Sequence, residues 1–113
     1  MTAITLEQVQ TAVANAREAA RAAGQAYLNQ HGDRDACGFA WVNIYGVKGS
    51  TKLGKTLTAA GVRKDYTGAF QIWNPSGLGC QSISVLEAGA DAAAKVLKEQ
   101  LGLEQVYAGS RMD

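Results

Sequence analysis

Residues 37–47, with the sequence CGFAWVNIYGV, alternate between small or branched apolar side chains and mostly aromatic ones. Successive side chains on a β-strand point to opposite faces of the sheet, so this alternation predicts a strand with two different faces. One face carries Ala40, Val42 and Ile44. The other carries Phe39, Trp41, Asn43 and Tyr45. Both faces therefore have apolar surface to bury.

A second, shorter run repeats this pattern in residues 69–74, AFQIWN. Phe70 and Ile72 are predicted to face a packed layer of helices. Gln71 and Trp73 then stand on the same side as the aromatic residues of the first run. Two neighbouring strands would thus present their aromatic rings on one face of the sheet.

Turn residues connect the remaining strands. Residues 62–74 form a predicted hairpin around Thr67, and residues 74–77, Asn-Pro-Ser-Gly, form a turn after it. Residues 103–110 are the predicted last strand, and Tyr107 on that strand is expected to extend the aromatic face.

The first of three helical segments begins at a capping box of Thr5 and Gln8 and is predicted to end near Asn29. Its apolar residues recur at spacings of three and four: Leu6, Val9, Val13, Ala16, Ala20, Ala23 and Tyr27. Because this seam is mostly alanine, it can pack closely on another helix of the same chain or of a second copy, which leaves a homodimer open.

Two further helices follow. Thr51 is predicted to cap a short helix that ends at Gly61. Ser84 and Glu87 form a predicted capping box for a helix that ends at Leu101.

The order of these segments predicts an α+β fold in a single domain, residues 1–113. An N-terminal helix, residues 1–30, is followed by a ferredoxin-like βαββαβ unit, residues 37–110. In that arrangement helices cover one face of a four-stranded antiparallel sheet. Right-handed crossovers place the first and third strands in the middle.

Composition agrees with a compact globular protein, since 47% of the residues are hydrophobic and 19% are charged. The N-terminus has no signal-peptide pattern and no apolar run is long enough to span a bilayer, so we expect a cytoplasmic protein without a membrane partner. Cys37 and Cys80 are far apart and neither belongs to a CxxC, so we expect two buried free thiols and no metal site.

Residues 49–56, GSTKLGKT, match the phosphate-loop pattern, in which Lys55 would reach the terminal phosphates and Thr56 would hold Mg²⁺. The rest of the chain argues against such an enzyme, because it predicts a hairpin, one helix and one strand in place of several βαβ units. No strand ends in a suitable aspartate either, since Asp65 lies in a turn and Asp91 in a helix. A nucleotide hydrolase of the phosphate-loop type is our second alternative function.

Residues 48–64 contain basic residues and no acidic one. The basic residues are Lys48, Lys52, Lys55, Arg63 and Lys64. Such a segment can bind a phosphate group without hydrolysis, or it can be a solvated basic surface. The net charge of the whole chain is only +1, which argues against a dedicated, sequence-blind nucleic-acid binder.

Other catalytic patterns are missing. His31 is the sole histidine and stands in a polar turn without a second imidazole or thiol at ligand spacing. Ser76 lacks both the preceding glycine of a nucleophile elbow and a histidine base after it. We therefore predict neither catalytic residues nor a cofactor.

The aromatic face is the leading candidate for a binding site. RNA-recognition domains of this topology stack bases on such residues, and GAFQIW, residues 68–73, is similar to part of one of their motifs. The predicted ligand-binding residues are Phe39, Trp41, Tyr45, Gln71 and Trp73, together with the five basic residues. Alternatively, the N-terminal helix or a second copy of the chain covers this face.

The segments GVKGSTKLGK, FQIWNPSG and YAGSRMD, with the alanine-rich helix between them, resemble small uncharacterised proteins of tailed bacteriophages, over about residues 38–113. This resemblance implies a host-takeover or anti-defence setting, in which short proteins act by binding. The leading hypothesis is a non-enzymatic protein that binds nucleic acid or a nucleotide. The first alternative is a phage inhibitor of a host or defence protein, similar to an anti-CRISPR, acting by protein–protein contact.

Overall fold

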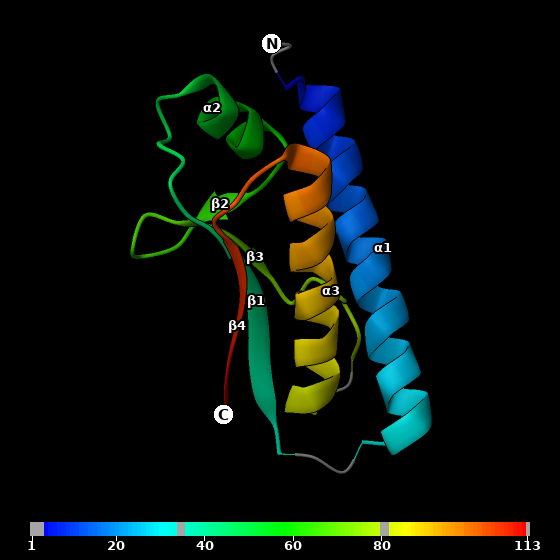
Figure 1. The fold of residues 1–113 in the computed structure, drawn as a ribbon. Coiled ribbons are helices and arrows are strands. Elements are labelled where there is room, and N and C mark those ends of the chain that lie inside the picture. Colours follow the sequence, from blue (N-terminus) through cyan, green and yellow to red (C-terminus); the bar gives the residue numbers. More distant parts are fainter. Residues whose placement is uncertain (1–3, 34–35, 80–81, 113) are drawn as a thin grey trace.

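The computed structural model describes residues 4–33, 36–79 and 82–112 as an α+β fold with three helices and a four-stranded antiparallel sheet (Figure 1). The elements are α1 (Leu6–His31), β1 (Gly38–Ile44), α2 (Lys52–Ala59), β2 (Arg63–Lys64), β3 (Phe70–Trp73), α3 (Ile83–Leu101) and β4 (Val106–Met112). The predicted order of helices and strands is therefore confirmed.

Helix α1 begins at the predicted capping box. The backbone N–H of Gln8 donates to the Thr5 hydroxyl at 3.1 Å, and the Thr5 N–H donates to Gln8 Oε1 at 2.8 Å. These two bonds satisfy amide groups that have no partner within the first helical turn. The helix continues past the predicted Asn29 to His31, where Gly32 forms the C-cap.

The buried face of α1 differs slightly from the predicted seam. It comprises Val9, Ala12, Val13, Ala16, Ala20 and Gly24. This face packs along α3, and the two helices approach closely, since a Cβ atom added at Gly89 of α3 would lie 3.0 Å from the Ala20 carbonyl oxygen. The small-residue seam therefore has its partner within the same chain.

The strands lie in the order β2-β3-β1-β4, and every neighbouring pair is antiparallel. The first and third strands are in the middle, as predicted. In the register of these strands Trp41 of β1 lies opposite Trp73 of β3 on one side and opposite Gly109 of β4 on the other. This register fixes which side chains become neighbours on each face of the sheet.

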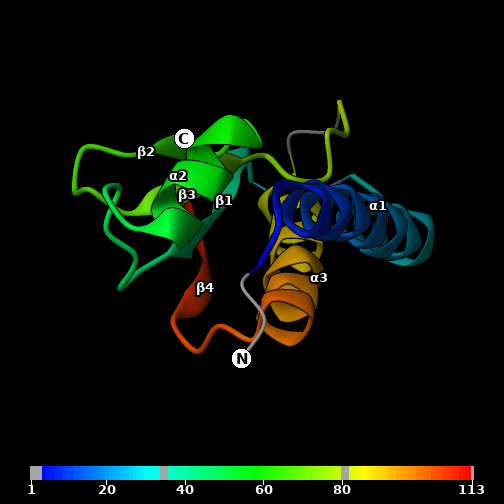
Figure 2. The same cartoon turned by 90° about the horizontal axis from the view of Figure 1, so that it is seen from above.

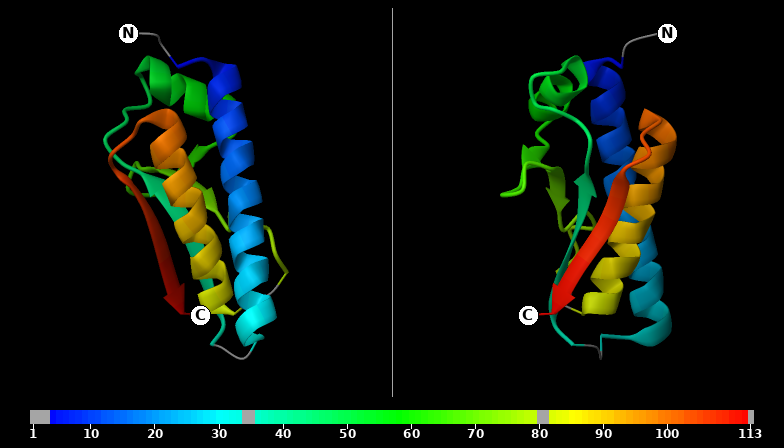
Figure 3. Two further views of the ribbon diagram at one scale, coloured as in Figure 1. Left: turned by 45° about the vertical axis from the view of Figure 1, so that its right-hand side comes forward. Right: turned by 60° about the vertical axis from the view of Figure 1, so that its left-hand side comes forward.

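Helices α1 and α3 lie on the same side of the sheet (Figures 2 and 3). Helix α3 packs against β1 and β4, and α1 packs along α3, whereas α2 lies over one end of the sheet beside the start of α1. The sequence predicted that the two helices after the first strand would cover the sheet. In the structure α1 covers it together with α3, because α2 is only one short helix of 8 residues.

Two local predictions are wrong. Helix α3 begins at Ile83 with Ser82 in the N-cap position, so Ser84 and Glu87 do not form its capping box. The Glu87 carboxylate instead accepts a hydrogen bond from the Ser110 hydroxyl of β4, at 2.7 Å. Cys37 is exposed and not buried, because it precedes β1 outside the packed layer. Cys80 lies outside the described residues.

Candidate functional site

The face of the sheet opposite α1 and α3 carries the aromatic side chains, and no helix of the described residues lies over it (Figure 2). The alternation of β1 is as predicted, with Ala40, Val42 and Ile44 buried toward the helices. On the open face the exposed fractions are 49% for Trp73, 41% for Tyr45 and 53% for Tyr107. The alternative in which the N-terminal helix covers this face is wrong, because that helix packs on α3 instead.

Three rings of the open face form a continuous strip. The indoles of Trp41 and Trp73 stack with centroids 5.5 Å apart and planes only 4° from parallel. The ring of Phe39 extends the strip, 5.6 Å from Trp73. The contact between the tryptophans follows from the sheet register, since directly opposed side chains are within reach of each other. All three residues were predicted to share this face.

Gly109 of β4 sets the position of the Trp41 indole. A Cβ atom added at Gly109 would lie 2.5 Å from Trp41 Nε1 and 2.7 Å from Cε2, closer than real Cβ atoms come to a neighbour. The indole therefore rests directly against the backbone of β4, in space that any other residue at this position would fill. Trp41 is held between Gly109 on one side and Trp73 on the other.

A ladder of polar side chains runs beside the aromatic strip. Gln71 Nε2 donates to Asn43 Oδ1 at 3.1 Å, and Asn43 Nδ2 donates to the Tyr45 hydroxyl at 3.0 Å. Asn43 is only 8% exposed, so its amide needs these partners. These bonds fix the orientation of the side-chain amides of Asn43 and Gln71. The side-chain oxygen of Gln71, Oε1, remains as the acceptor at the end of the ladder.

The turn between β2 and β3 forms a rim of the open face and projects beyond the sheet (Figure 1). Asp65 Oδ1 organises the turn by accepting bonds from the Thr67 hydroxyl at 2.6 Å, the Thr67 N–H at 2.8 Å and the Ala69 N–H at 3.0 Å. The hydroxyl bond, with help from backbone N–H groups and against a smaller desolvation, holds the pKa of Asp65 below its ordinary value. Tyr66, next in the turn, is fully exposed.

Two adjoining hollows lie between this turn and the sheet, with volumes of about 310 and 410 Å³. Both are lined by Trp41, Asp65, Tyr66 and Gln71. The first continues over β4 to Tyr107 and Gly109, and the second continues to Trp73 and Arg111. Together they make one groove, which we call the turn groove, with aromatic walls and a carboxylate at its rim.

Arg111 is a residue of this face that sequence reasoning missed. It lies opposite Phe39 in the β1–β4 register, and its guanidinium carbon is 5.7 Å from the centre of the Phe39 ring. The predicted last strand ended at residue 110, whereas β4 continues to Met112. The alternation of Tyr107, Gly109 and Arg111 would have placed the arginine on the open face if the strand had been extended.

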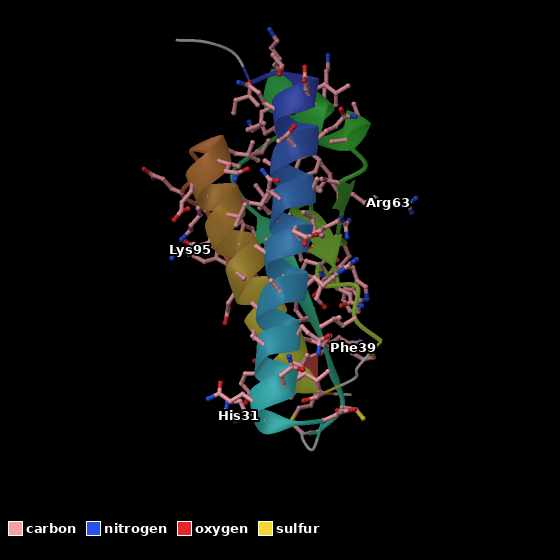
Figure 4. The ribbon with its side chains drawn as sticks, turned by 90° about the vertical axis from the view of Figure 1, so that its right-hand side faces the viewer. His31, Phe39, Arg63 and Lys95 are labelled. Atoms are coloured by element: carbon pink, nitrogen blue, oxygen red, sulfur yellow. The ribbon has the colours of Figure 1, made fainter. Side chains whose placement is uncertain are left out.

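The basic residues of the predicted site, Lys48, Lys52, Lys55, Arg63 and Lys64, are all exposed but do not form one surface with the aromatic strip. Only Arg63 shares the open face, because it lies opposite Gln71 in the register. Lys64 lies opposite Phe70 and places its Nζ 5.4 Å from that ring. Arg63 points outward from the edge of the sheet, and Lys95 points outward from α3 on the other side of the molecule (Figure 4).

The phosphate-loop segment is largely helical. Thr51 caps α2 by accepting a bond from the Gly54 N–H at 3.1 Å, and the Thr56 hydroxyl donates to the Lys52 carbonyl oxygen at 2.7 Å. Gly54 is packed against the Lys48 carbonyl with no room for a side chain. The Thr56 hydroxyl that would hold Mg²⁺, and the N–H groups of Gly54 and Lys55, are thus bonded within the segment itself.

His31 and Ser76, for which the sequence predicted no catalytic role, each contact a neighbouring side chain. The ring of His31 packs against that of Tyr27, with centroids 4.3 Å apart and planes inclined by 37°. Ser76 is buried and donates to Asn74 Oδ1 at 3.2 Å. Residues 4–33, 36–79 and 82–112 contain no cluster of histidine, cysteine, aspartate and glutamate that could hold a metal ion. No helix in those ranges combines the length and the apolar character needed to cross a membrane.

Comparison with known proteins adds no relative. The chain matches no protein-family model, no curated protein and no solved structure.

Proposed function

We propose that this protein is a non-enzymatic binding protein that stacks the bases of single-stranded nucleic acid, or of a nucleotide, on the open face of its sheet. The observation that carries the proposal is the stacked pair of Trp41 and Trp73 on two central strands, in which Trp73 is 49% exposed, with no element of the described chain over it. Flat aromatic surfaces beside a cation are the common feature of single-strand binding sites.

The cation in this site is Arg111. Its guanidinium lies over Phe39 and lines the turn groove with Trp41 and Trp73. A phosphate beside a stacked base can therefore reach a positive charge without help from the more distant lysines. Arg63 provides a second charge on the same face, next to Gln71.

The expected affinity is moderate. Each base stacked on an aromatic side chain contributes about 1–3 kcal/mol, so two or three platforms and a few phosphate contacts suffice for micromolar binding, about 8 kcal/mol. The net charge of +1 limits the contribution of long-range attraction. Stacking, and not general charge, is thus the main source of affinity in this proposal.

The alternative function is contact with a host protein through the same face, in the phage setting that the sequence resemblance implies. Exposed tryptophan, tyrosine and arginine are the residue types that dominate protein interfaces, and this face carries all three. A second copy of the chain is one protein partner of this kind.

We also propose that the chain is a variant of the ferredoxin-like fold. The antiparallel order β2-β3-β1-β4, with α3 connecting β3 to β4 across one face, supports this assignment. In this proposal α1 takes the position beside α3 that a longer first crossover helix would occupy, while α2 is reduced to a short connecting helix.

Titration of labelled single-stranded DNA and RNA, about 12 nucleotides long and of mixed sequence, tests the proposed function by fluorescence anisotropy. We expect micromolar binding that Trp73→Ala weakens about tenfold, since one stacking platform is lost. Tyr27→Ala, an aromatic truncation on α1, is the matched control and should bind normally. Absence of binding to either nucleic acid at millimolar protein would overturn the proposal, and capture of a nuclease-resistant protein partner would favour the alternative.

A further inference from the structure

We propose that the turn groove recognises the exocyclic amino group of a base, so that cytosine is preferred to thymine or uracil. This inference rests on the proposed function, because it concerns a base that is already stacked on the open face. The observation that carries it is a pair of acceptor oxygens on residues that line the groove, Asp65 Oδ2 and Gln71 Oε1. The other polar atom of each side chain, Asp65 Oδ1 or Gln71 Nε2, is already hydrogen-bonded within the chain.

The first acceptor is Asp65. All the side-chain hydrogen bonds that hold the β2–β3 turn end on Oδ1, which receives the Thr67 hydroxyl and the N–H groups of Thr67 and Ala69. Within the described part of the chain no donor is bonded to Oδ2. A carboxylate fixed through one oxygen presents the other as a pre-oriented acceptor at the rim of the groove.

The second acceptor is Gln71, which lines the groove with Asp65. Its Nε2 is engaged with Asn43 Oδ1, and the orientation of that amide is fixed in turn by the bond from Asn43 to Tyr45. Its Oε1 has no donor among the described residues. The ladder on β1 and β3 therefore leaves Gln71 Oε1 available to accept a hydrogen bond from a ligand.

The dimensions and the remaining walls of the groove suit a nucleotide. Trp41 and Trp73 give it an aromatic wall, Tyr66 stands exposed on the turn, and Arg111 lines the far part of the same hollow of about 410 Å³. The carboxylate and the guanidinium thus both line a hollow that contains stacking surface. A base stacked there can direct its edge toward Asp65 while its phosphate approaches Arg111.

Cytosine differs from thymine and uracil in the exocyclic group that would face Asp65. Cytosine carries an amino donor at the position where thymine and uracil carry a carbonyl acceptor. Facing Asp65 Oδ2, the amino group forms a charge-assisted hydrogen bond, whereas the carbonyl brings two acceptors together and leaves both without a donor. Since stacking surface and phosphate are nearly equal in the two ligands, the difference in affinity reports this contact.

The test compares oligo(dC) with oligo(dT) of equal length at about pH 8, where both cytosine and the Asp65 carboxyl lack a proton. We expect oligo(dC) to bind about tenfold more tightly. In Asp65→Asn the order should reverse, because Oδ1 still accepts the bonds of the turn while the amide nitrogen replaces Oδ2 and donates to the thymine carbonyl. Asp91→Asn on α3 is the control for the change of charge.

A second measurement leaves the protein unchanged. An oligomer of N4,N4-dimethylcytosine keeps the ring but has no amino hydrogen, and it should lose the preference over oligo(dT). Equal binding of oligo(dC), oligo(dT) and the methylated oligomer would overturn the inference and leave the proposed function intact. Absence of binding to every oligomer would overturn both, and a preference for cytosine that survives methylation would assign the selectivity to another contact and overturn the role of Asp65.

Discussion

The indole of Trp41 occupies the space that a side chain at Gly109 would need. The register makes these residues neighbours on β1 and β4, and a Cβ atom at Gly109 would come within 2.5 Å of Trp41 Nε1. The indole lies between backbone on one side and Trp73 on the other, so the stacked pair depends on a glycine in the adjacent strand.

Gly109→Ala should therefore separate the two tryptophans without unfolding the sheet. The added methyl group displaces the Trp41 indole, so we expect the near-ultraviolet circular dichroism of the coupled indoles to weaken and oligonucleotide affinity to fall severalfold. Gly79→Ala is the control, because nothing lies within 4 Å of a Cβ atom at that position. An unchanged spectrum in Gly109→Ala would show that Trp41 does not depend on this space.

The contact between α1 and α3 should be equally sensitive to side-chain size. A Cβ atom at Gly89 would lie 3.0 Å from the Ala20 carbonyl oxygen and 3.0 Å from Ser76 Cβ. We expect Gly89→Val to lower the free energy of unfolding by about 2 kcal/mol, as measured by urea denaturation. Ala92→Val, a half-buried position of the same helix, should cost only about 0.5 kcal/mol. Because Gly→Val raises helix propensity and Ala→Val lowers it, a loss in Gly89→Val no larger than that in Ala92→Val would show that the contact between α1 and α3 does not depend on side-chain size.

Short-range sequence patterns predicted most of the fold. The alternation in residues 37–47 assigned Ala40 and Trp41 to opposite faces, and Thr5 marked the start of α1, because strand pleat and helix capping depend only on neighbouring residues. The position of α1 was not predictable in this way. It depends on the fit of α1 against α3 at Gly89, between helices that are far apart in the sequence.

The candidate site was predicted only where it follows from strand alternation. Trp73 was assigned to the open face by its place in β3, but Arg111 was missed because the predicted strand ended too early. The turn groove was also missed, since Asp65 meets Trp41 only when the β2–β3 turn projects beside the sheet. Lys55 was included in the predicted site only because of its charge. It belongs to α2, which lies at one end of the sheet.

Acid should destabilise the turn between β2 and β3 through Asp65. The hydrogen bonds from Thr67 and the nearby backbone hold the folded-state pKa of Asp65 below its ordinary value of 3.8, so the unfolded chain binds more protons in the interval between the two values. Stability from this group is present above that interval and is lost as the pH falls through the folded pKa. Because the carboxyl group is exposed, the effect is small.

Urea denaturation at several pH values between about 6 and 2 measures this effect. The difference in unfolding free energy between the wild type and Asp65→Asn should be constant at the upper end and should shrink below about pH 4. Asp91→Asn removes a carboxylate of α3 and is the control for the change of charge. If the difference for Asp65→Asn grows as the pH falls, the direction of the pKa shift is wrong.

Arg111 should account for a measurable share of the salt dependence of binding. Its guanidinium lies by the aromatic strip, so Arg111→Ala should weaken binding to a single-stranded oligonucleotide and make the slope of log K against log salt shallower by about 0.7, the value for one phosphate contact. Lys95→Ala removes the same charge from α3, which packs on the opposite face of the sheet, and should leave the slope unchanged. Equal slopes for Arg111→Ala and Lys95→Ala would show that Arg111 does not contact a phosphate. A larger loss of affinity in Lys55→Ala than in Arg111→Ala would indicate that the phosphates bind at the end of the sheet that carries α2.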